Sequence, residues 1–369
     1  MGGIDVANGI VGAVLGIVFA TLFQQPLQDG WYRIRRRYSS AVRSLRTRGE
    51  EPAPASWTTF SLGPLHTSAL IVEGDGESAI AAEAVHIQVL DEEVVLPEDM
   101  AGWRAEIEGE SARREAENGA PVWNGPRYAV ESLDVSRTAL EEHPLVHLRL
   151  RPTDYYTFLA AQQLDRRLAD GTTPRTRYLD PDDPLAAPAF LQCSFAANVA
   201  VVTADDMLVV SRRSDRVRMA PGVWNSSVNE GLSRHIDSSG RNAPDLFAVA
   251  RRGMREELAL EPHEYTLVLL AFVLDADRRH WSAHFSARLT TLTRDDLRAR
   301  MSRGVADRWE HQSFDHVPFR PADVARYLLR PDRVHRWAPL APALFHLALV
   351  HEHGRTSVER AEAQVVRRL

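Results

Sequence analysis

Two adjacent acids, Glu256 and Glu257, follow Arg252 in the segment ARRGMREELAL, which has the composition of a helix. Positions three and four apart share one face of an α-helix, so Arg252 and Glu256 can form an ion pair there. Carboxylates gathered on one face are also the oxygen ligands that hold Mg²⁺ against phosphate groups. The segment therefore has two interpretations, a solvated helix with an ion pair and a site for a divalent cation.

The spacing resembles the back half of the Nudix box, whose pattern is Gly-x5-Glu-x7-Arg-Glu-U-x-Glu-Glu-x-Gly-U with U aliphatic. The positions that match are Arg252, Glu256, Glu257 and Leu260. Gly253 stands where the box has a third glutamate, and Ala259 stands where it has a glycine. The resemblance implies that Glu256 and Glu257 hold Mg²⁺ (or Mn²⁺), while Arg252 supports this cofactor site by orienting the acids.

Other acids would have to complete such a site. Glu230, in VNEG, could replace the front glutamate of the box, whose usual register is broken by an insertion before residue 245. Glu310 lies in a later segment, where members of the family often provide a further acid. The resemblance thus implies catalytic roles for Glu257, Glu230 and Glu310, which would complete the metal site or orient the attacking water.

The missing carboxylate at Gly253 has two explanations. A glutamate there would share a helix face with Glu256 and Glu257, so Gly253→Glu is expected to increase hydrolysis if the site is only weakened. Alternatively, the helix crosses a neighbouring element closely at Gly253 and leaves no room for a side chain. The sequence alone keeps both explanations open.

The residues around this helix predict alternating strands and helices. Strands are expected at 195–203, 207–211, 265–274 and 280–292, and a closing helix is expected at 337–351. RRS and PGVW precede the helix, as they do in Nudix domains. The expected fold class is α/β, a Nudix-like α/β/α sandwich preceded by an α+β region and an N-terminal transmembrane helix.

Composition shifts divide the chain into five expected segments. These are a transmembrane anchor (1–30), an Arg-rich juxtamembrane segment and linker (31–56), an α+β region of unknown role (57–190), the Nudix-like domain (191–350) and a charged C-terminal tail (351–369).

The N-terminal segment has the pattern of a single membrane span. Residues 4–23 are almost entirely apolar or small, and about 20 such residues cross a bilayer as a helix. Trp31, Tyr32 and an arginine cluster within residues 33–48 follow it, which is typical of an interface and a cytoplasmic flank that meets anionic lipid. We therefore expect a single-pass protein of the cell membrane with its C-terminal domains in the cytoplasm. Gly12 and Gly16 form a GxxxG pair that would suit a homodimer.

The overall charge limits the partners that the sequence predicts, and the cysteine content limits the disulfides and metal sites that can form. The net charge is −6, which gives no global reason to expect nucleic-acid binding. Cys193 is the only cysteine, so neither an intramolecular disulfide nor a cysteine-based zinc site can form. The expected partners are a nucleotide or another diphosphate-containing small molecule, and the membrane.

Two functions follow from these observations. The first is a membrane-anchored Nudix-like protein that binds a nucleotide or another diphosphate compound and hydrolyses it if enough acids remain to hold Mg²⁺. The second is a non-catalytic sensor that transmits ligand binding to the membrane segment or to partners. The Glu256–Glu257 pair favours the enzyme, whereas Gly253 favours the sensor.

Full-length protein is expected to sediment with membranes until detergent is added, because the arginines follow the apolar run and none precedes it. High-speed centrifugation of a cell lysate, followed by immunoblotting, measures this. A chain without residues 1–30 is the control and should stay in the supernatant. Full-length protein in the supernatant without detergent would show that the anchor interpretation is wrong.

Overall fold

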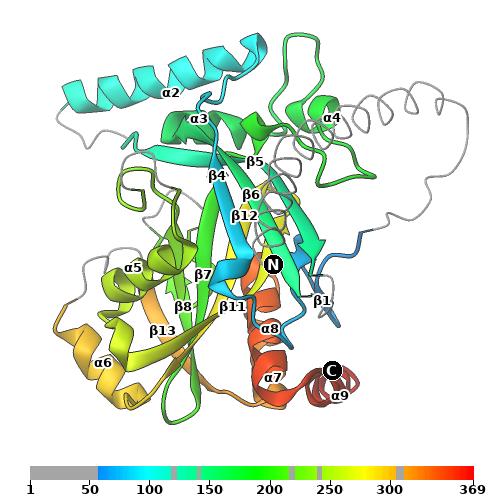
Figure 1. Cartoon of the computed structure of the whole chain (residues 1–369), viewed down its shortest axis with the longest axis vertical. Helices are drawn as coiled ribbons and strands as arrows, with labels where there is room; N and C mark the ends of the chain where they lie inside the picture. Colours follow the sequence, from blue (N-terminus) through cyan, green and yellow to red (C-terminus); the bar gives the residue numbers. More distant parts are fainter. Residues whose placement is uncertain (1–56, 118–122, 139–142, 216–220, 239–242, 305–310) are drawn as a thin grey trace, which may run out of the picture. The chain divides into compact units, whose positions relative to one another are not determined.

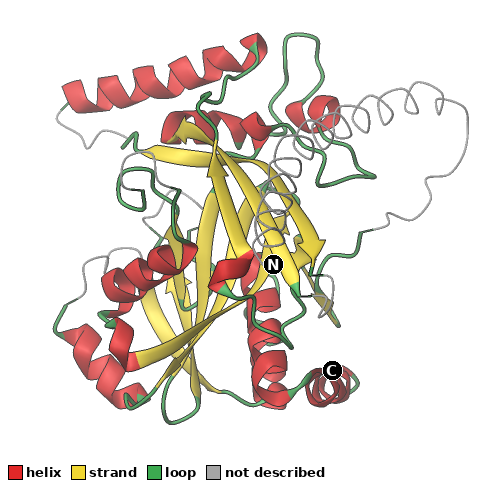
Figure 2. Cartoon of the chain, in the orientation of Figure 1, coloured by secondary structure: helices red, strands yellow, loops and turns green. Residues whose placement is uncertain are grey.

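The computed structural model describes residues 57–117, 123–138, 143–215, 221–238, 243–304 and 311–369. Trp57–Leu369 form one compact unit of mixed α/β structure (Figures 1 and 2), which confirms the α/β class. The apolar run at 4–23, the arginine cluster and Glu310 lie outside the described residues. Within the ranges that are described, no helix has both the length and the apolar character needed to span a bilayer.

A mixed β-sheet forms the centre of the unit, and the described residues contribute eight strands to it. Its main path runs β13–β8–β7–β12–β11–β3, with β10 paired to β7 and β9 paired to β8. β7 and β12 are parallel, and the other pairs are antiparallel. The strands are β3 (Ala69–Glu73), β7 (Phe195–Val202), β8 (Met207–Arg213), β9 (Trp224–Asn225), β10 (Val228–Gly231), β11 (Tyr265–Asp275), β12 (His280–Leu289) and β13 (His311–Pro318).

Helices cover both faces of this sheet, because alternate residues of each strand point to opposite sides. In β7, Val199 and Val201 belong to the core under α5 (Leu246–Leu258). Ala200 and Val202 belong to the core under α8 (Leu340–His353). The sheet is therefore the middle layer of an α/β/α arrangement.

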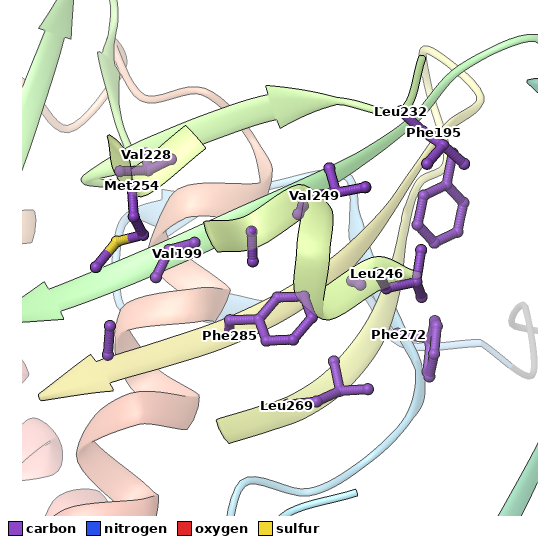
Figure 3. Close-up of a cluster of buried hydrophobic side chains, with 14 of the residues drawn as sticks. Phe195, Val199, Val228, Leu232, Leu246, Val249, Met254, Leu269, Phe272 and Phe285 are labelled. Atoms are coloured by element: carbon purple, nitrogen blue, oxygen red, sulfur yellow. The ribbon is translucent and has the colours of Figure 1, made fainter. Parts of the chain in front are cut away.

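The sequence of α5 explains where this helix begins, ends and packs. Asp245 caps it, since its Oδ1 accepts a hydrogen bond from Phe247 N at 2.8 Å. Figure 3 shows Leu246, Val249 and Met254 pointing into the cluster that β7, β11 and β12 complete. Ala259 ends the helix with a left-handed φ of 55°, the conformation for which glycine is preferred and in which alanine costs about 1 kcal/mol.

A smaller sheet of three described strands packs against the same core. It contains β4 (Val85–Val89), β5 (Pro126–Arg137) and β6 (Pro144–Asp154), in the order β4–β6–β5. Its buried Val130 and Leu148 belong to the cluster that includes α5. Residues 57–190 thus share a hydrophobic core with residues 191–350, and β3 adds a strand to the main sheet.

Gln192 lies near the boundary between residues 57–190 and residues 191–350 and forms hydrogen bonds with both regions. Its Oε1 accepts hydrogen bonds from Trp281 Nε1 at 2.6 Å and from Arg279 at 3.3 Å. Its Nε2 donates to the carbonyl oxygens of Val130 at 3.2 Å and Ala187 at 3.0 Å. A buried side chain with this many bonds fixes β5, β12 and the intervening chain relative to one another.

The remaining described elements surround the two sheets. Helix α2 packs on α3 through a cluster that includes Trp103 and Phe158. The elements are β1 (Ser61–Leu62), β2 (Leu65–His66), α2 (Glu98–Ala116), α3 (Tyr155–Ala161), α4 (Pro174–Tyr178), α6 (Arg294–Ser302), α7 (Pro321–Leu328), α9 (Arg355–Val366) and the 3-10 turns Ala82–Ala84, Ala189–Leu191 and Pro262–Glu264.

The C-terminal residues differ from the charged tail that their composition predicts. Residues 351–353 complete α8, and α9 follows after Gly354. Val358 and Val365 of α9 are buried with residues of α7 and α8. These two residues and the partly buried Val366 form the apolar side of α9, whose exposed positions are mostly polar or charged.

Candidate functional site

Arg252 of α5 is the centre of the predicted site, and its guanidinium is buried. It binds both carboxylate oxygens of Asp237, with Nε–Oδ1 at 3.0 Å and Nη2–Oδ2 at 2.9 Å. Nη2 also donates to the carbonyl oxygen of Gly231 at 3.0 Å, and Nη1 lies 2.7 Å from Glu230 Oε1. The predicted pair with Glu256 is the longest contact, at 3.5 Å. Arg252 therefore mainly fastens β10 and the loop after it to α5.

Several opposing effects set the charge of this cluster. Burial lowers the pKa of Arg252, but the carboxyl groups of Asp237 and Glu230 raise it above its ordinary value. Burial raises the pKa of Glu230 to about 8, and Glu257 and Glu256 add to this rise while Arg252 opposes it. Burial thus outweighs the effect of Arg252 on Glu230, and the bidentate contact with Asp237 is the main ion pair of Arg252.

Glu257 has both carboxylate oxygens engaged by protein groups. Oε1 accepts a hydrogen bond from the backbone N–H of Asn229 at 3.0 Å. Oε2 lies 2.6 Å from Nε2 of His311, the first residue of β13. The side chains of Glu257 and His311 are only 2% and 4% exposed. This buried pair ties α5 to β10 and to the edge strand of the sheet.

These residues do not fit Mg²⁺ or Mn²⁺, whose site in proteins needs free carboxylate oxygens. Glu257 is occupied by His311 and Asn229, and Glu256 faces the cation of Arg252. Among the residues that the structure describes, no three acidic, histidine or cysteine side chains are arranged to hold a metal ion. In this structure both oxygens of Glu257 are thus engaged by hydrogen bonds within the protein.

The structure supports the packing explanation of Gly253. A Cβ atom built at this position would lie 2.7 Å from Cβ of Glu230 and 2.7 Å from Cγ1 of Val228. Both atoms lie close to the backbone of β10, so neither can move aside cheaply. The expectation that a glutamate at position 253 would join the other acids is wrong, because β10 fills the space.

The structure brings Glu230, Arg252, Glu256 and Glu257 into one cluster, whereas Glu310 lies outside the described residues. Sequence reasoning missed Asp237 and His311 as members of the cluster. Asp237 lies in the insertion that breaks the box, so no family position pointed to it. His311 directly follows Glu310, and this adjacency is the signal that could have revealed it.

A second polar group, also missed, lies in the buried sheet beside this cluster. Asn198 Nδ2 donates to Ser282 Oγ at 2.6 Å, and Asn198 Oδ1 accepts from Ser226 Oγ at 2.9 Å. The side-chain amide of Asn229 also donates to Asn198 Oδ1. Asn229 therefore joins the two groups, because its backbone N–H holds Glu257.

His284 is the unusual member of this second group. It pairs with Asn198 in the β7–β12 ladder and is completely buried. Neither ring nitrogen has a hydrogen-bond partner. Burial lowers the pKa of His284 to about 3, so the ring is neutral, with one donor and one acceptor unused. Buried polar groups without partners are rare, and a small polar ligand or a water would satisfy them.

Neither a scan against protein-family models nor a search of curated proteins finds a match for this chain. Solved structures do match parts of it. It is similar to a Deinococcus radiodurans protein at 22% identity (TM-score 0.21), with 31% of this chain covering 75% of that chain. It is also similar to a MutT Nudix hydrolase of Burkholderia pseudomallei at 14% identity (TM-score 0.27), with 42% covering 96%.

A third similar structure is that of Shewanella oneidensis NrtR complexed with a 27mer DNA, at 16% identity and a TM-score of 0.28. The match covers 42% of this chain and 59% of that chain. DNA binding is a property of that complex. The expectation that this protein binds no nucleic acid stays a prediction.

Gly253→Ala is expected to lower the free energy of unfolding by about 1–3 kcal/mol, because the added methyl group overpacks the contact with β10. Chemical denaturation measures the change. Gly109→Ala on α2 is the matched control, since no atom lies within 4 Å of a Cβ there and alanine should stabilise that helix by about 0.5–1 kcal/mol. Equal stabilisation by both substitutions would contradict the packing explanation.

Glu230→Gln should change how stability depends on pH. The pKa of Glu230 is about 8 in the folded protein, above its ordinary value, so unfolding releases a proton between these two pH values. Wild-type stability should therefore fall relative to Glu230→Gln by about 1 kcal/mol per pH unit as pH rises from 5 to 8. Urea denaturation at several pH values measures the difference. A difference that is constant or that grows in favour of the wild type would show that Glu230 is ionised.

Proposed function

We propose that this protein is a non-catalytic module with a Nudix-like fold, which binds a nucleotide or another diphosphate-containing small molecule without hydrolysing it. The observation that carries the proposal is the engagement of both Glu257 oxygens, by His311 Nε2 and by the N–H of Asn229. In this proposal the box resemblance reflects a retained scaffold, and the acids that would hold a metal hold the protein together.

The chemistry of Mg²⁺-dependent hydrolysis supports this choice. Such an enzyme needs open carboxylate positions that hold the ion against the phosphates and help to generate the attacking hydroxide. Glu257 offers none, burial raises the pKa of Glu230 to about 8, and Gly253 is packed against β10. Weak hydrolysis would require Glu257 to exchange a buried partner for the ion, which leaves His311 without its acceptor.

The second polar group supports ligand binding. Its side chains are amides, hydroxyls and a neutral imidazole, which can recognise the edges of an uncharged polar ring. Asn229 connects Asn198 of this group to Glu257 on α5. A ligand that displaced the amide of Asn229 from Asn198 would therefore perturb the packing of β10 on α5. This connection gives the module a route by which occupancy reaches the rest of the chain.

The proposal also includes attachment to a membrane. The apolar residues 4–23 and the arginines that follow are the basis for a single-pass anchor with a cytoplasmic module. The module would then report ligand binding at the inner face of the cell membrane.

Isothermal titration of the full chain with ADP, with Mg²⁺ and then with EDTA, tests the proposal. Binding should be the same in both solutions, and no phosphate or AMP should be released on prolonged incubation. His284→Phe should weaken binding about tenfold or more without lowering the unfolding free energy, because it removes unsatisfied nitrogens from the core. Glu256→Gln is the control and should bind as the wild type does.

The opposite outcome identifies a hydrolase. Mg²⁺-dependent release of product that disappears in Glu257→Gln would show that Glu257 exchanges His311 for a metal ion. The proposal would then be wrong, even if ADP also binds in EDTA.

A further inference from the structure

A cavity of about 740 Å³ lies away from α5, between α2, the end of α3 and the turn that joins β11 to β12. Its apolar surface comes from Ile107 and Leu159. Its polar lining includes Arg113, Arg166 and Arg278, which come from distant parts of the sequence. Cavities of roughly 300–1,000 Å³ accommodate small-molecule ligands. No residue of the Arg252 cluster lines this cavity, so it would be a separate site.

The charges that line the cavity do not cancel. Glu106 is neutralised by Arg166, whose Nη1 lies 2.8 Å from Glu106 Oε2. Glu110 is neutralised by Arg114, one turn further along α2. Arg113 and Arg278 line the cavity and, in the described part of the chain, neither guanidinium makes a hydrogen bond or an ion pair. Arg278 also interacts electrostatically with the buried carboxyl group of Asp275. The lining still has an excess of positive charge, because it contains three arginines and two glutamates.

The walls of the cavity are held in place by contacts between its elements. The guanidinium of Arg166 stacks over the ring of Trp103 at 4.6 Å and donates to Gln163 Oε1 at 3.0 Å. Gln162 Nε2 donates to the carbonyl oxygen of Arg278 at 2.8 Å, which fastens the β11–β12 turn to the end of α3. A ligand would thus meet walls that are already assembled, which reduces the entropic cost of binding.

We propose that this cavity binds a phosphate ester with an apolar group, with the phosphate between Arg113 and Arg278 and the apolar group on Ile107 and Leu159. Guanidinium groups bind phosphate oxygens in pairs, and two of them match a doubly charged phosphate. A cationic ligand does not suit the cavity, because Glu106 and Glu110 are already paired. This inference does not rest on the proposed function of the Nudix-like domain.

Titration of the full chain with hexyl phosphate, monitored by calorimetry at constant ionic strength, tests the site. Arg113→Ala and Arg278→Ala should each weaken binding about tenfold, because each removes one charge-assisted contact. Arg326→Ala is the control, since this exposed arginine of α7 is paired with Asp323 and neither residue lines the cavity. It should change the affinity less than about twofold. Inorganic phosphate should bind more weakly than hexyl phosphate, because it has no apolar group.

A second probe distinguishes a soluble phosphate ester from a lipid headgroup. Dihexanoylphosphatidic acid, used below its micellar concentration, carries the same phosphate on a lipid backbone. Binding of both probes through Arg113 and Arg278 supports the site, and the tighter probe identifies the source of the ligand. The inference is wrong if hexyl phosphate does not saturate the protein or if Arg326→Ala weakens binding as much as Arg113→Ala does.

The phosphate site in the cavity and the proposed nucleotide site can be tested independently of each other. His284→Phe should leave hexyl phosphate binding unchanged, whereas Arg113→Ala should leave ADP binding in the Nudix-like domain unchanged. Loss of ADP binding alone would contradict the proposed function and leave the cavity as a phosphate site.

Discussion

The buried guanidinium of Arg252 is the interaction on which the centre of this protein depends. Desolvating one arginine together with several acids is costly unless each charge has a partner in good geometry. Here Asp237 accepts two hydrogen bonds from the guanidinium, the carbonyl oxygen of Gly231 accepts a further one, and burial raises the pKa of Glu230. The arrangement holds α5, β10 and the following loop together.

This constraint explains why the acids of the cluster do not behave as separate ligands. The carboxylate of Glu257 contacts His311 and the backbone N–H of Asn229. These contacts connect α5 to β13 and to the polar residues around Asn198. A metal ion at Glu257 would have to break one of these buried contacts. The same contacts connect α5 to the buried polar residues around Asn198 through Asn229.

The sequence predicted the strands and helices whose hydrophobic periodicity is strong. It did not predict the features that depend on how distant segments of the chain pack against each other. The strands that became β7, β8, β11 and β12 and the helix α5 follow from alternation and helical spacing. The role of Gly253 depends on how closely β10 crosses α5, which no local pattern encodes. Asp237 lies in an insertion, and His284 looks like any strand residue until its missing hydrogen bonds are seen. Residues 351–369 contain many charged side chains, so the apolar residues that dock α9 were not recognised from the sequence.

Titration of the full chain with Mn²⁺, followed by electron paramagnetic resonance, tests most directly whether protein groups have replaced the metal. Free Mn²⁺ gives a signal that is lost on binding, so the measurement reports affinity without any need for a substrate. The account predicts no site tighter than about 1 mM in the wild type. A site with a dissociation constant of about 10 µM that is lost in Glu257→Gln would contradict it.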